Sequence, residues 1–326
     1  MVFQLAPEEF WKRYARLNQK FSKKLVFHLG ASAGLFSEIN GMISAMVYCL
    51  ERGIGFQMYC GDANFTRDGK GWQSFFSSAV PECYESFHHH YNHRMNHLSA
   101  KSDFLKLLQV IPAVLLKRKY GFHYFTYELF VKILQENWAG RIIHWDDLNF
   151  SGSFPDAFAL FAHYLWKLNQ ETTLQCEKLI RSLQLPKQFV AFQIRSGDKI
   201  VEAKLPPPDI YLQKATQLTT IRNAFILTDD YRIFEYLQQK WKNWQFHTLA
   251  EKSEKGYYIQ QLQLLPDETF RLKHISLIAS MELFRRAEYF IGSYFPNPCI
   301  FANALRCYKN NIFIDNSESP GERSNV

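Results

Sequence analysis

The sequence lacks the features that define several protein classes. Its six cysteines include no C-x-x-C pair, so neither a redox motif nor a paired-cysteine zinc site is indicated. Their scattered spacing gives no disulfide framework, which favours a reducing compartment. No apolar run is long enough to span a bilayer, and the first residues carry no secretory apolar region. We therefore expect a cytoplasmic protein, with peripheral membrane association as an open alternative.

Two common ligand-binding motifs are also missing. There is no G-x-G-x-x-G run, so a dinucleotide site is not indicated, and no D-x-D arrangement of the metal-nucleotide kind. The net charge of +7 is moderate, and the basic runs are short. Without a basic stripe or a recognised module, nucleic-acid binding is the weakest of the functions considered.

What the sequence does contain is an alternation of strand and helix patterns. At 326 residues, with 47% hydrophobic and 21% charged residues, the chain is long enough for two α/β domains. In the first half we expect an amphipathic helix over 6–20, strands over 25–29 and 55–60, a helix over 38–51 and a helical pattern over 155–183. In the second half we expect strands near 189–194, 223–227, 245–249, 289–292 and 311–314, with helices near 208–219, 231–240, 271–286 and 297–305.

A break at Leu185-Pro186-Lys187 separates the two halves. It places the predicted domains at residues 1–186 and 187–314. The polar segment 315–326 is predicted to be a flexible tail.

The strand Phe189–Ile194 is the most informative segment because it stops abruptly at a polar sequence, Arg195-Ser196-Gly197-Asp198-Lys199. Ligands of open α/β sheets bind at the carboxyl ends of strands. An arginine can fork onto phosphate oxygens, while the aspartate can position the lysine or a ribose hydroxyl. The pattern indicates an anionic ligand such as a nucleoside diphosphate; the alternative is a surface turn with a salt bridge.

Several motifs in order extend this interpretation. The segment 194–199, Glu202-Ala203, Thr228-Asp229-Asp230 and the segment 286–293 together resemble the donor-binding half of a fucosyltransferase superfamily. Its members include the core α1,6-fucosyltransferases, the nodulation-factor fucosyltransferase and the protein O-fucosyltransferases. The resemblance covers residues 187–305 and implies a GT-B-like α/β fold, with two Rossmann-like lobes and a cleft between them. The N-terminal lobe would then be the acceptor side and the C-terminal lobe the nucleotide-sugar side.

The resemblance also implies an activity: inverting, metal-independent transfer of fucose from GDP-fucose to a glycan hydroxyl, without a cofactor. Arg195 would bind the diphosphate with help from Lys199, and Glu202 would be the general base. The alternative for Glu202 is a surface ion pair with Lys204. The remaining residues expected at the donor are Gln193, Ser196, Asp198, Tyr211, Asp229, Asp230 and Ser293.

A glycine-containing loop in the first half is a second candidate site. It joins the strand ending near His28 to the next helix, and Gly34, Glu38 and Asn40 match the corresponding turn of the resembled superfamily. The amide groups of a helix N-terminus can receive an anion or sugar hydroxyls. The alternative is a capped helix with Ser37 as its N-cap.

Two further clusters bear on metal binding. On a helix, His89, His93 and His97 would share one face at four-residue steps, a spacing able to bind Zn²⁺. The favoured alternative is a surface or acceptor-contact segment, so no metal site is predicted. Asp229 and Asp230 are adjacent, and in a strand they would point to opposite faces and chelate poorly.

The chain departs from the superfamily pattern at two positions. Gln193 replaces a histidine, and Ser196 replaces the second arginine of a His-x-Arg-Arg segment. Serine removes a cation and a bidentate fork from the diphosphate site. Two alternatives to GDP-fucose transfer therefore stay open: a transferase that uses another nucleotide sugar, and an inactive fucosyltransferase-like protein that binds sugars or partners.

Overall fold

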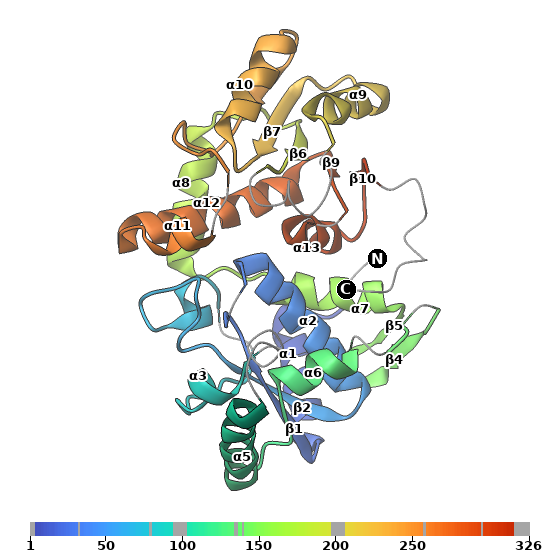
Figure 1. Cartoon of the computed structure of the whole chain (residues 1–326). Coiled ribbons are helices and arrows are strands. Elements are labelled where there is room, and N and C mark those ends of the chain that lie inside the picture. Colours follow the sequence, from blue (N-terminus) through green and yellow to red (C-terminus); the bar gives the residue numbers. More distant parts are fainter. Residues whose placement is uncertain are drawn as a thin grey trace. The chain divides into compact units, whose positions relative to one another are not determined.

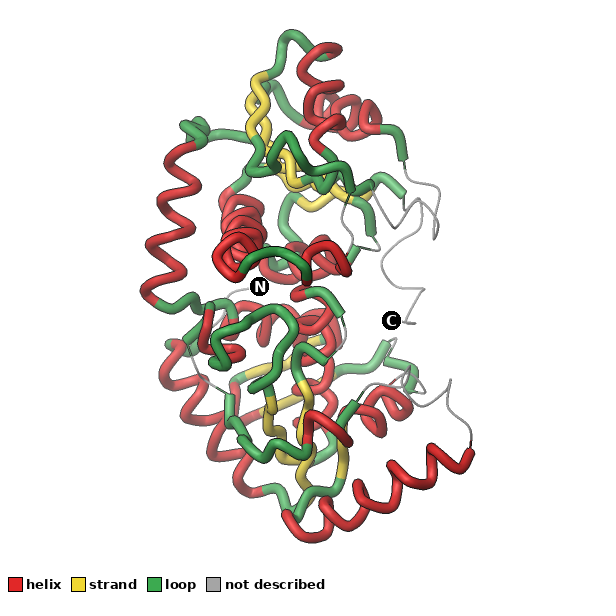
Figure 2. Tube along the Cα trace, turned by 60° about the vertical axis from the view of Figure 1, so that its left-hand side comes forward, coloured by secondary structure: helices red, strands yellow, loops and turns green. Residues whose placement is uncertain are grey.

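The computed structural model describes residues 4–31, 33–77, 80–93, 103–133, 136–138, 140–196, 206–256, 259–294 and 296–315. The chain forms two compact units, the first reaching Lys167 and the second starting at Leu168 (Figure 1). In each unit the strands, yellow in Figure 2, run between helices, drawn in red. None of the described helices combines the length and apolar character needed to cross a lipid bilayer.

The first unit is built on a parallel sheet with the order β2-β1-β3 and a separate antiparallel pair, β4-β5. Leu25 to His28 of β1 are all buried, as expected for a parallel strand covered on both faces. The elements of this unit are α1 (Pro7–Lys20), β1 (Lys23–His28), α2 (Leu35–Glu51), β2 (Ile54–Tyr59), the 3₁₀ turn η1 (Gly71–Ser74), α3 (His88–Tyr91), α5 (Asp103–Tyr120), β3 (Tyr124–Phe125), α6 (Thr126–Ile133), β4 (Ile143–Trp145), η2 (Asp146–Leu148), β5 (Phe150–Gly152) and α7 (Phe154–Leu165).

The start of α2 differs from the expected one. The helix begins at Leu35, three residues before the predicted start, and its N-cap is Gly34, so Ser37 lies inside the first turn. The Glu38 carboxylate explains the difference, because it accepts hydrogen bonds from the amides of Gly30 and Ala33, each at 2.9 Å. A carboxylate from within the helix thus satisfies two amides of the loop before it, and Gly34 caps the helix without a side-chain hydrogen bond.

The second unit is a parallel sheet with the order β10-β9-β6-β7-β8. The chain starts at the central strand β6, adds β7 and β8 on one side, and then adds β9 and β10 on the other, which is the doubly wound arrangement. The elements are α8 (Gln170–Ser182), β6 (Val190–Gln193), α9 (Pro208–Leu218), β7 (Asn223–Leu227), α10 (Tyr231–Lys240), β8 (Gln245–His247), α11 (Ile259–Gln263), α12 (Asp267–Arg286), β9 (Tyr289–Gly292), α13 (Asn297–Leu305) and β10 (Asn311–Phe313).

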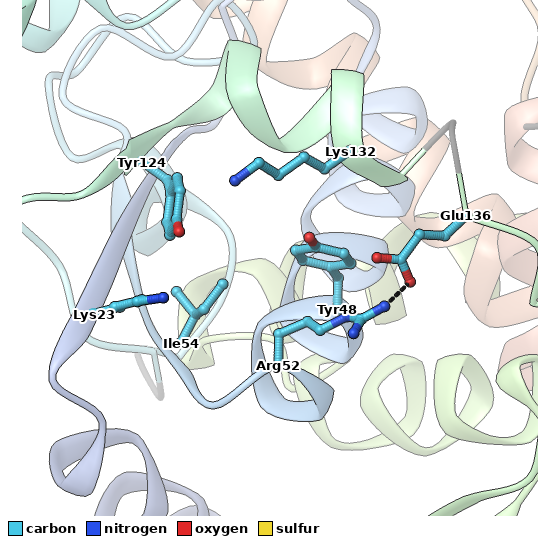
Figure 3. A pocket seen from close by; sticks show the side chains of 7 residues that line it. All are labelled: Lys23, Tyr48, Arg52, Ile54, Tyr124, Lys132 and Glu136. Atoms are coloured by element: carbon cyan, nitrogen blue, oxygen red, sulfur yellow. Dashed lines mark hydrogen bonds and ion pairs between the residues drawn. The ribbon is translucent and has the colours of Figure 1, made fainter.

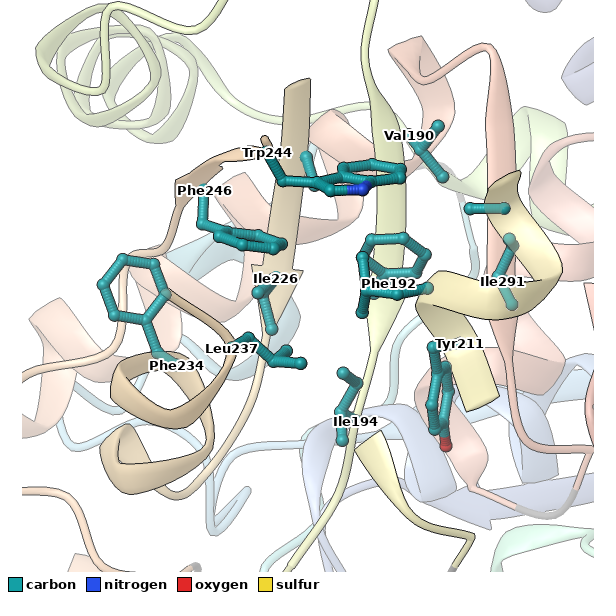
Figure 4. Packing of buried hydrophobic residues seen from close by; sticks show 13 residues of the cluster. Val190, Phe192, Ile194, Tyr211, Ile226, Phe234, Leu237, Trp244, Phe246 and Ile291 are labelled. Carbon is teal, nitrogen blue, oxygen red and sulfur yellow. The ribbon is translucent and has the colours of Figure 1, made fainter. Parts of the chain in front are cut away.

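Helices cover both faces of this sheet. On one face Phe192 of β6 and Ile226 of β7 pack with Tyr211 of α9 and Leu237 of α10 (Figure 4). On the other face Phe284 of α12 contacts rings of β7 and β9, including Phe290 at 4.7 Å between centroids. Because apolar side chains of the strands are covered by helices on both faces, the polar loops of this sheet lie at the strand ends.

The compact units divide before α8, whereas the sequence placed the boundary at 186/187. The helical pattern over 155–183 is two helices, because Asn169 caps a new helix by accepting a hydrogen bond from the amide of Thr172 at 2.8 Å. Helix α8 then packs against α12 of the second unit, and Arg271 pairs with Glu171 at 2.9 Å. Its packing partners therefore assign α8 to the second unit.

A buried polar network ties the carboxyl ends of the first sheet together. The Asn92 side chain donates to the carbonyl of Val26 at 2.9 Å and accepts from the amide of Thr126 at 2.8 Å. The hydroxyl of Thr126 accepts from the amide of His28 at 2.7 Å. The ring of His28, 1% exposed, contacts the main-chain oxygen of Asn92 at 2.7 Å and Asp62 at 2.8 Å. Strands β1 and β3 and the segments after β2 and α3 are thus linked by hydrogen bonds rather than by apolar packing alone.

Asp62 is the charged member of this network. One carboxylate oxygen bonds Nε2 of His28 and the other bonds Nδ1 of His89. Burial alone would raise the pKa of Asp62, but the hydrogen bonds and charges of the two histidines lower it to about 2. Both ring nitrogens of His28 face oxygen acceptors, so both contacts are hydrogen bonds only when each nitrogen carries a hydrogen.

We predict that Asp62→Asn lowers the free energy of unfolding by about 2 kcal/mol at pH 7, because it leaves buried His28 without its anionic partner. A carboxyl whose pKa is lowered on folding stabilises the protein above its unfolded value and loses that contribution as pH falls through the folded value. The wild-type advantage should therefore shrink between about pH 4 and pH 2. Urea unfolding at several pH values measures both effects.

Asp146→Asn is the matched control, because Asp146 pairs with His144 at 2.7 Å and both side chains are exposed. This control should change stability by less than about 0.5 kcal/mol. Equal losses for the two variants would show that burial of the Asp62 pair contributes nothing.

Candidate functional site

The topological switch point of the second unit lies between β6 and β9. These two strands are parallel neighbours. After β6 the chain adds strands on one side of the sheet, and after β9 it adds a strand on the other side. The carboxyl ends of such a strand pair leave a crevice that commonly binds ligands. Pairing with β7 continues to Ile194, whose amide donates to the carbonyl of Leu227 at 3.0 Å. Arg195 is therefore the first residue beyond the sheet. Ser293 and Tyr294 follow β9, and Thr228 to Asp230 follow β7.

The structure brings some of the predicted donor residues to this edge and leaves others untested. Arg195 and Ser196 follow β6 directly, as expected. Asp198, Lys199 and Glu202 lie outside the described residues. Their roles stay predictions.

Asp229 and Asp230 both contact Ser196. The amide of Ser196 donates to Oδ1 of Asp229 at 2.7 Å, and its hydroxyl donates to Oδ2 of Asp230 at 3.4 Å. Both aspartates lie in the turn after β7 and not in the strand, so the alternation of faces considered for a strand does not apply to them. The turn thus holds the main chain after β6 in place.

The two aspartates have different surroundings. Asp230 is the N-cap of α10 and binds the side chain of Arg232 at 2.6 and 2.9 Å. These bonds, with Arg232 as the main cause, lower the pKa of Asp230 against the effect of burial. Asp230 is buried while Asp229 is half-buried. Of the two, Asp229 is better placed for a ligand hydroxyl.

Tyr211 and Ser293 form a second link at this edge. Their hydroxyls lie 3.0 Å apart, joining α9 to the end of β9. Burial raises the pKa of Tyr211 well above its usual range, partly offset by the bond to Ser293. The phenol therefore keeps its proton and can donate. Both side chains are buried, so their hydrogen bond stabilises this edge from inside the unit.

Helix α13 begins beside the end of β6. The Cys299 thiol donates to the side-chain oxygen of Gln193, and both residues are buried. Burial raises the pKa of the Cys299 thiol, and the positive charge of Arg195 opposes this rise. Because Gln193 contacts the first turn of α13, the chain leaves β6 next to this turn, where helix amides and the helix dipole favour an anion.

Gly292 sets how closely α13 approaches β9. A Cβ atom at this position would stand 2.6 Å from the Cys299 sulfur, which is too close for any side chain.

The glycine loop of the first unit is less open to an anion than the sequence suggested. Gly34 is the N-cap of α2, and Asn40 lies on the second turn of that helix and is buried. The amides of Gly30 and Ala33 are already bound by Glu38. Gly30 has a positive φ of 81°, and a Cβ there would stand 2.7 Å from Ala63. Roles of Gly34 and Asn40 in donor binding stay predictions.

The histidine cluster does not form the predicted face. Helix α3 ends at Tyr91, because Asn92 leaves helical geometry to bond β1 and Thr126. His93 therefore does not follow His89 on a helix, and His97 lies outside the described residues.

A different group, Cys83, Glu85 and His88, has ligand atoms within 4.8 Å of one another. Burial lowers the pKa of His88 to about 3, so the ring is neutral. Its Nδ1 lies 3.2 Å from the amide nitrogen of Asn92 and accepts that hydrogen bond, which leaves the ring hydrogen on Nε2. Neither nitrogen then offers a lone pair, so the arrangement does not suit a metal ion.

Sequence reasoning missed Asp62 and Asn92. Their partners in β1 lie 34 to 66 residues away in the sequence, so no local spacing pattern indicates these contacts. The one available signal was His28, a polar residue at the end of an otherwise apolar strand.

No protein-family model matches the chain, and no curated protein matches its sequence. Solved structures do resemble it. NodZ alpha-1,6-fucosyltransferase, from a crystal soaked with GDP-fucose, superposes with a TM-score of 0.52 at 11% identity, covering 87% of this chain and 92% of that one. POFUT1 in complex with GDP-fucose gives a TM-score of 0.51 at 9% identity, covering 90% and 97%. NodZ from Bradyrhizobium gives 0.50 at 12%, covering 86% and 91%.

At these identities the likeness concerns the fold. Both compact units carry parallel sheets flanked by helices, and the likeness extends over most of each compared chain. The predicted fold class is confirmed: the chain has the GT-B-like α/β fold of the fucosyltransferases.

Proposed function

We propose that this chain is an inverting, metal-independent glycosyltransferase that moves fucose from GDP-fucose to a glycan hydroxyl. The observation that carries the proposal is the switch-point edge of the second unit, where Arg195 follows the end of β6 and Gln193 of that strand contacts the first turn of α13. The likeness in fold to NodZ and POFUT1, whose structures include GDP-fucose, supports the same donor.

The first task of the site is to stabilise the departing diphosphate. Its negative charge grows as the bond to the sugar breaks, and a cation with preorganised amides can meet it. Arg195 supplies the guanidinium fork, and the N-terminal turn of α13 supplies the positive end of a helix dipole. Lys199 is proposed as the second cation.

Sugar or ribose hydroxyls are assigned to the turn after β7. Asp229 is fixed by the amide of Ser196 at 2.7 Å, so its carboxylate has a defined direction before a ligand arrives. Ser196 in turn contacts Asp230, whose place is set by α10 and Arg232. Tyr211 and Ser293 hold the neighbouring strand end, so the donor would meet a rigid edge.

The acceptor hydroxyl must lose its proton as it attacks the anomeric carbon. We assign this step to Glu202 as general base, because an ionised carboxylate can take up that proton. The bond from the acceptor oxygen to the sugar forms while the bond to the diphosphate breaks on the opposite face. A β-linked donor then yields an α-fucoside.

An inactive fucosyltransferase-like binding protein is the second candidate. It is favoured by the buried side chain of Gln193, whose oxygen accepts from Cys299, and by Ser196 in place of an arginine. A transferase for another nucleotide sugar would share the same edge. A cytoplasmic location and peripheral membrane association stay predictions.

We predict that GDP and GDP-fucose bind in preference to UDP and CDP compounds. Arg195→Gln should raise the Kd for GDP roughly 30-fold, the effect of losing a charge-assisted contact of about 2 kcal/mol. Calorimetric titration measures both. Arg181→Gln on α8, at an exposed position, is the control and should leave the Kd unchanged. If no nucleotide binds to the wild type, the donor assignment fails.

We also predict that Glu202→Gln lowers the rate of fucose transfer at least 100-fold, because the general base is lost. The Kd for GDP should stay within about twofold, since glutamine keeps the shape of the side chain. Glu235→Gln on the exposed face of α10 should behave as wild type in both assays. If Glu202→Gln transfers fucose at the wild-type rate, another residue is the base. If the wild type binds the donor but transfers no fucose, the result favours the second candidate, an inactive binding protein.

A further inference from the structure

The first unit has a concave site at the end of its sheet opposite to His28 and Asp62. Lys23 is the first residue of β1 and Ile54 the first of β2, so the site lies at the amino ends of these strands. The cavity has a volume of about 390 Å³ and is lined by Lys23, Tyr48, Arg52, Ile54, Tyr124, Lys132 and Glu136 (Figure 3). We call this cavity the basic pocket.

Positive charge exceeds negative charge in the basic pocket. Glu136 is the one acidic residue of its lining, and its Oε2 is shared by Arg52 at 2.5 Å and Arg141 at 3.4 Å. The hydrogen bond to Glu136 is the main cause of the raised pKa of Arg52. The negative charge of Glu136 is therefore already balanced by two guanidinium groups.

The two lysines of the lining differ from Arg52, whose charge is paired with Glu136. Within the described residues no carboxylate lies in ion-pair range of Lys23 or Lys132. Figure 3 shows the ammonium group of Lys132 between Tyr124 and Tyr48, and that of Lys23 next to Ile54 on the side of Tyr124. The ammonium nitrogen of Lys132 lies 3.9 Å from the centre of the Tyr124 ring, an arrangement that holds the cation over the ring face. Two like charges gathered in one hollow favour occupation by an anion.

The floor of the basic pocket is partly shielded from water. Tyr48 and Ile54 are both 5% exposed, and burial is the main cause of the raised pKa of Tyr48. Lys132 is half-buried and Lys23 is exposed, so water screens the charge of Lys132 less than that of Lys23. The Tyr48 phenol also keeps its proton and can donate a hydrogen bond to an anion or a hydroxyl.

Size and lining together indicate the ligand class. The volume corresponds to about a dozen water molecules, more than a lone phosphate fills. Two ammonium groups suit a dianionic phosphate, while the tyrosine rings offer flat apolar surfaces and hydroxyls to a sugar ring. We propose that the basic pocket binds a phosphomonoester of a sugar, with Lys23 and Lys132 on the phosphate and Tyr48 and Tyr124 beside the ring. The proposal does not depend on the donor site of the second unit.

The test uses the full chain and calorimetric titration with glucose-6-phosphate, glucose and inorganic phosphate. We expect glucose-6-phosphate to bind more tightly than either fragment and less tightly as salt is added. The double variant Lys23→Gln, Lys132→Gln should weaken binding of glucose-6-phosphate at least 10-fold. Lys12→Gln on α1, an exposed lysine outside the lining, should bind as wild type. Thermal unfolding of each variant checks that the fold is retained.

Three outcomes would overturn the proposal. Equal affinity of the wild type and the double variant would place the ligand elsewhere. Equal affinity for inorganic phosphate and glucose-6-phosphate would remove the sugar part. Binding to vesicles that contain phosphatidic acid, without binding of glucose-6-phosphate, would make the surface a membrane contact. Tyr124→Phe gives an independent check, since it should weaken glucose-6-phosphate binding while leaving phosphate binding unchanged.

Discussion

The pairing of β6 with β9 is the constraint on which the candidate donor site depends. These two strands lie side by side while the chain continues from them to opposite sides of the sheet, an arrangement that commonly leaves a crevice at the carboxyl ends of the strands. Arg195, the turn around Asp229 and the start of α13 all reach the same edge through this one pairing. A sheet with the same strands in consecutive order would leave no such opening, whatever residues followed each strand.

The two ends of the first sheet have opposite characters. At the carboxyl end, Asp62 is bonded to two histidines and Asn92 bonds three chain segments, so the polar groups there are used internally. At the amino end, cationic side chains surround a hollow. The first arrangement stabilises the unit, since the side chains of Asn92, Thr126 and His28 are buried with hydrogen-bond partners. The second is suited to a ligand, since its charges are not balanced within its lining.

The sequence predicted the regular elements well where periodicity and buried apolar runs dominate. All five strands expected in the second half are present, and so are the helices near 208–219, 231–240 and 297–305. The predictions failed where a single side chain decides the local structure. Glu38 bonds the loop before α2, and Ser37 is not the N-cap of that helix. Asn169 starts a new helix within 155–183, and Asn92 ends α3 before His93.

These failures share a physical cause. Each involves a polar side chain that hydrogen-bonds a main-chain group, and whether such a bond forms depends on segments brought together by folding. For the candidate site, the sequence identified Arg195, Ser196 and Asp229 at one edge. It did not reveal that Ser196 is the residue through which both aspartates are connected to β6.

The contact of Gln193 with Cys299 above Gly292 has a consequence for sequence change. The thiol needs an acceptor at position 193, the helix needs a small residue at position 292, and the glutamine needs a donor at position 299. A histidine at 193 would require a different partner on α13, and a larger residue at 299 would push the helix from the strand. Substitutions at these three positions should therefore be tolerated in combination and not one at a time. We expect the residues at 193, 292 and 299 to change together.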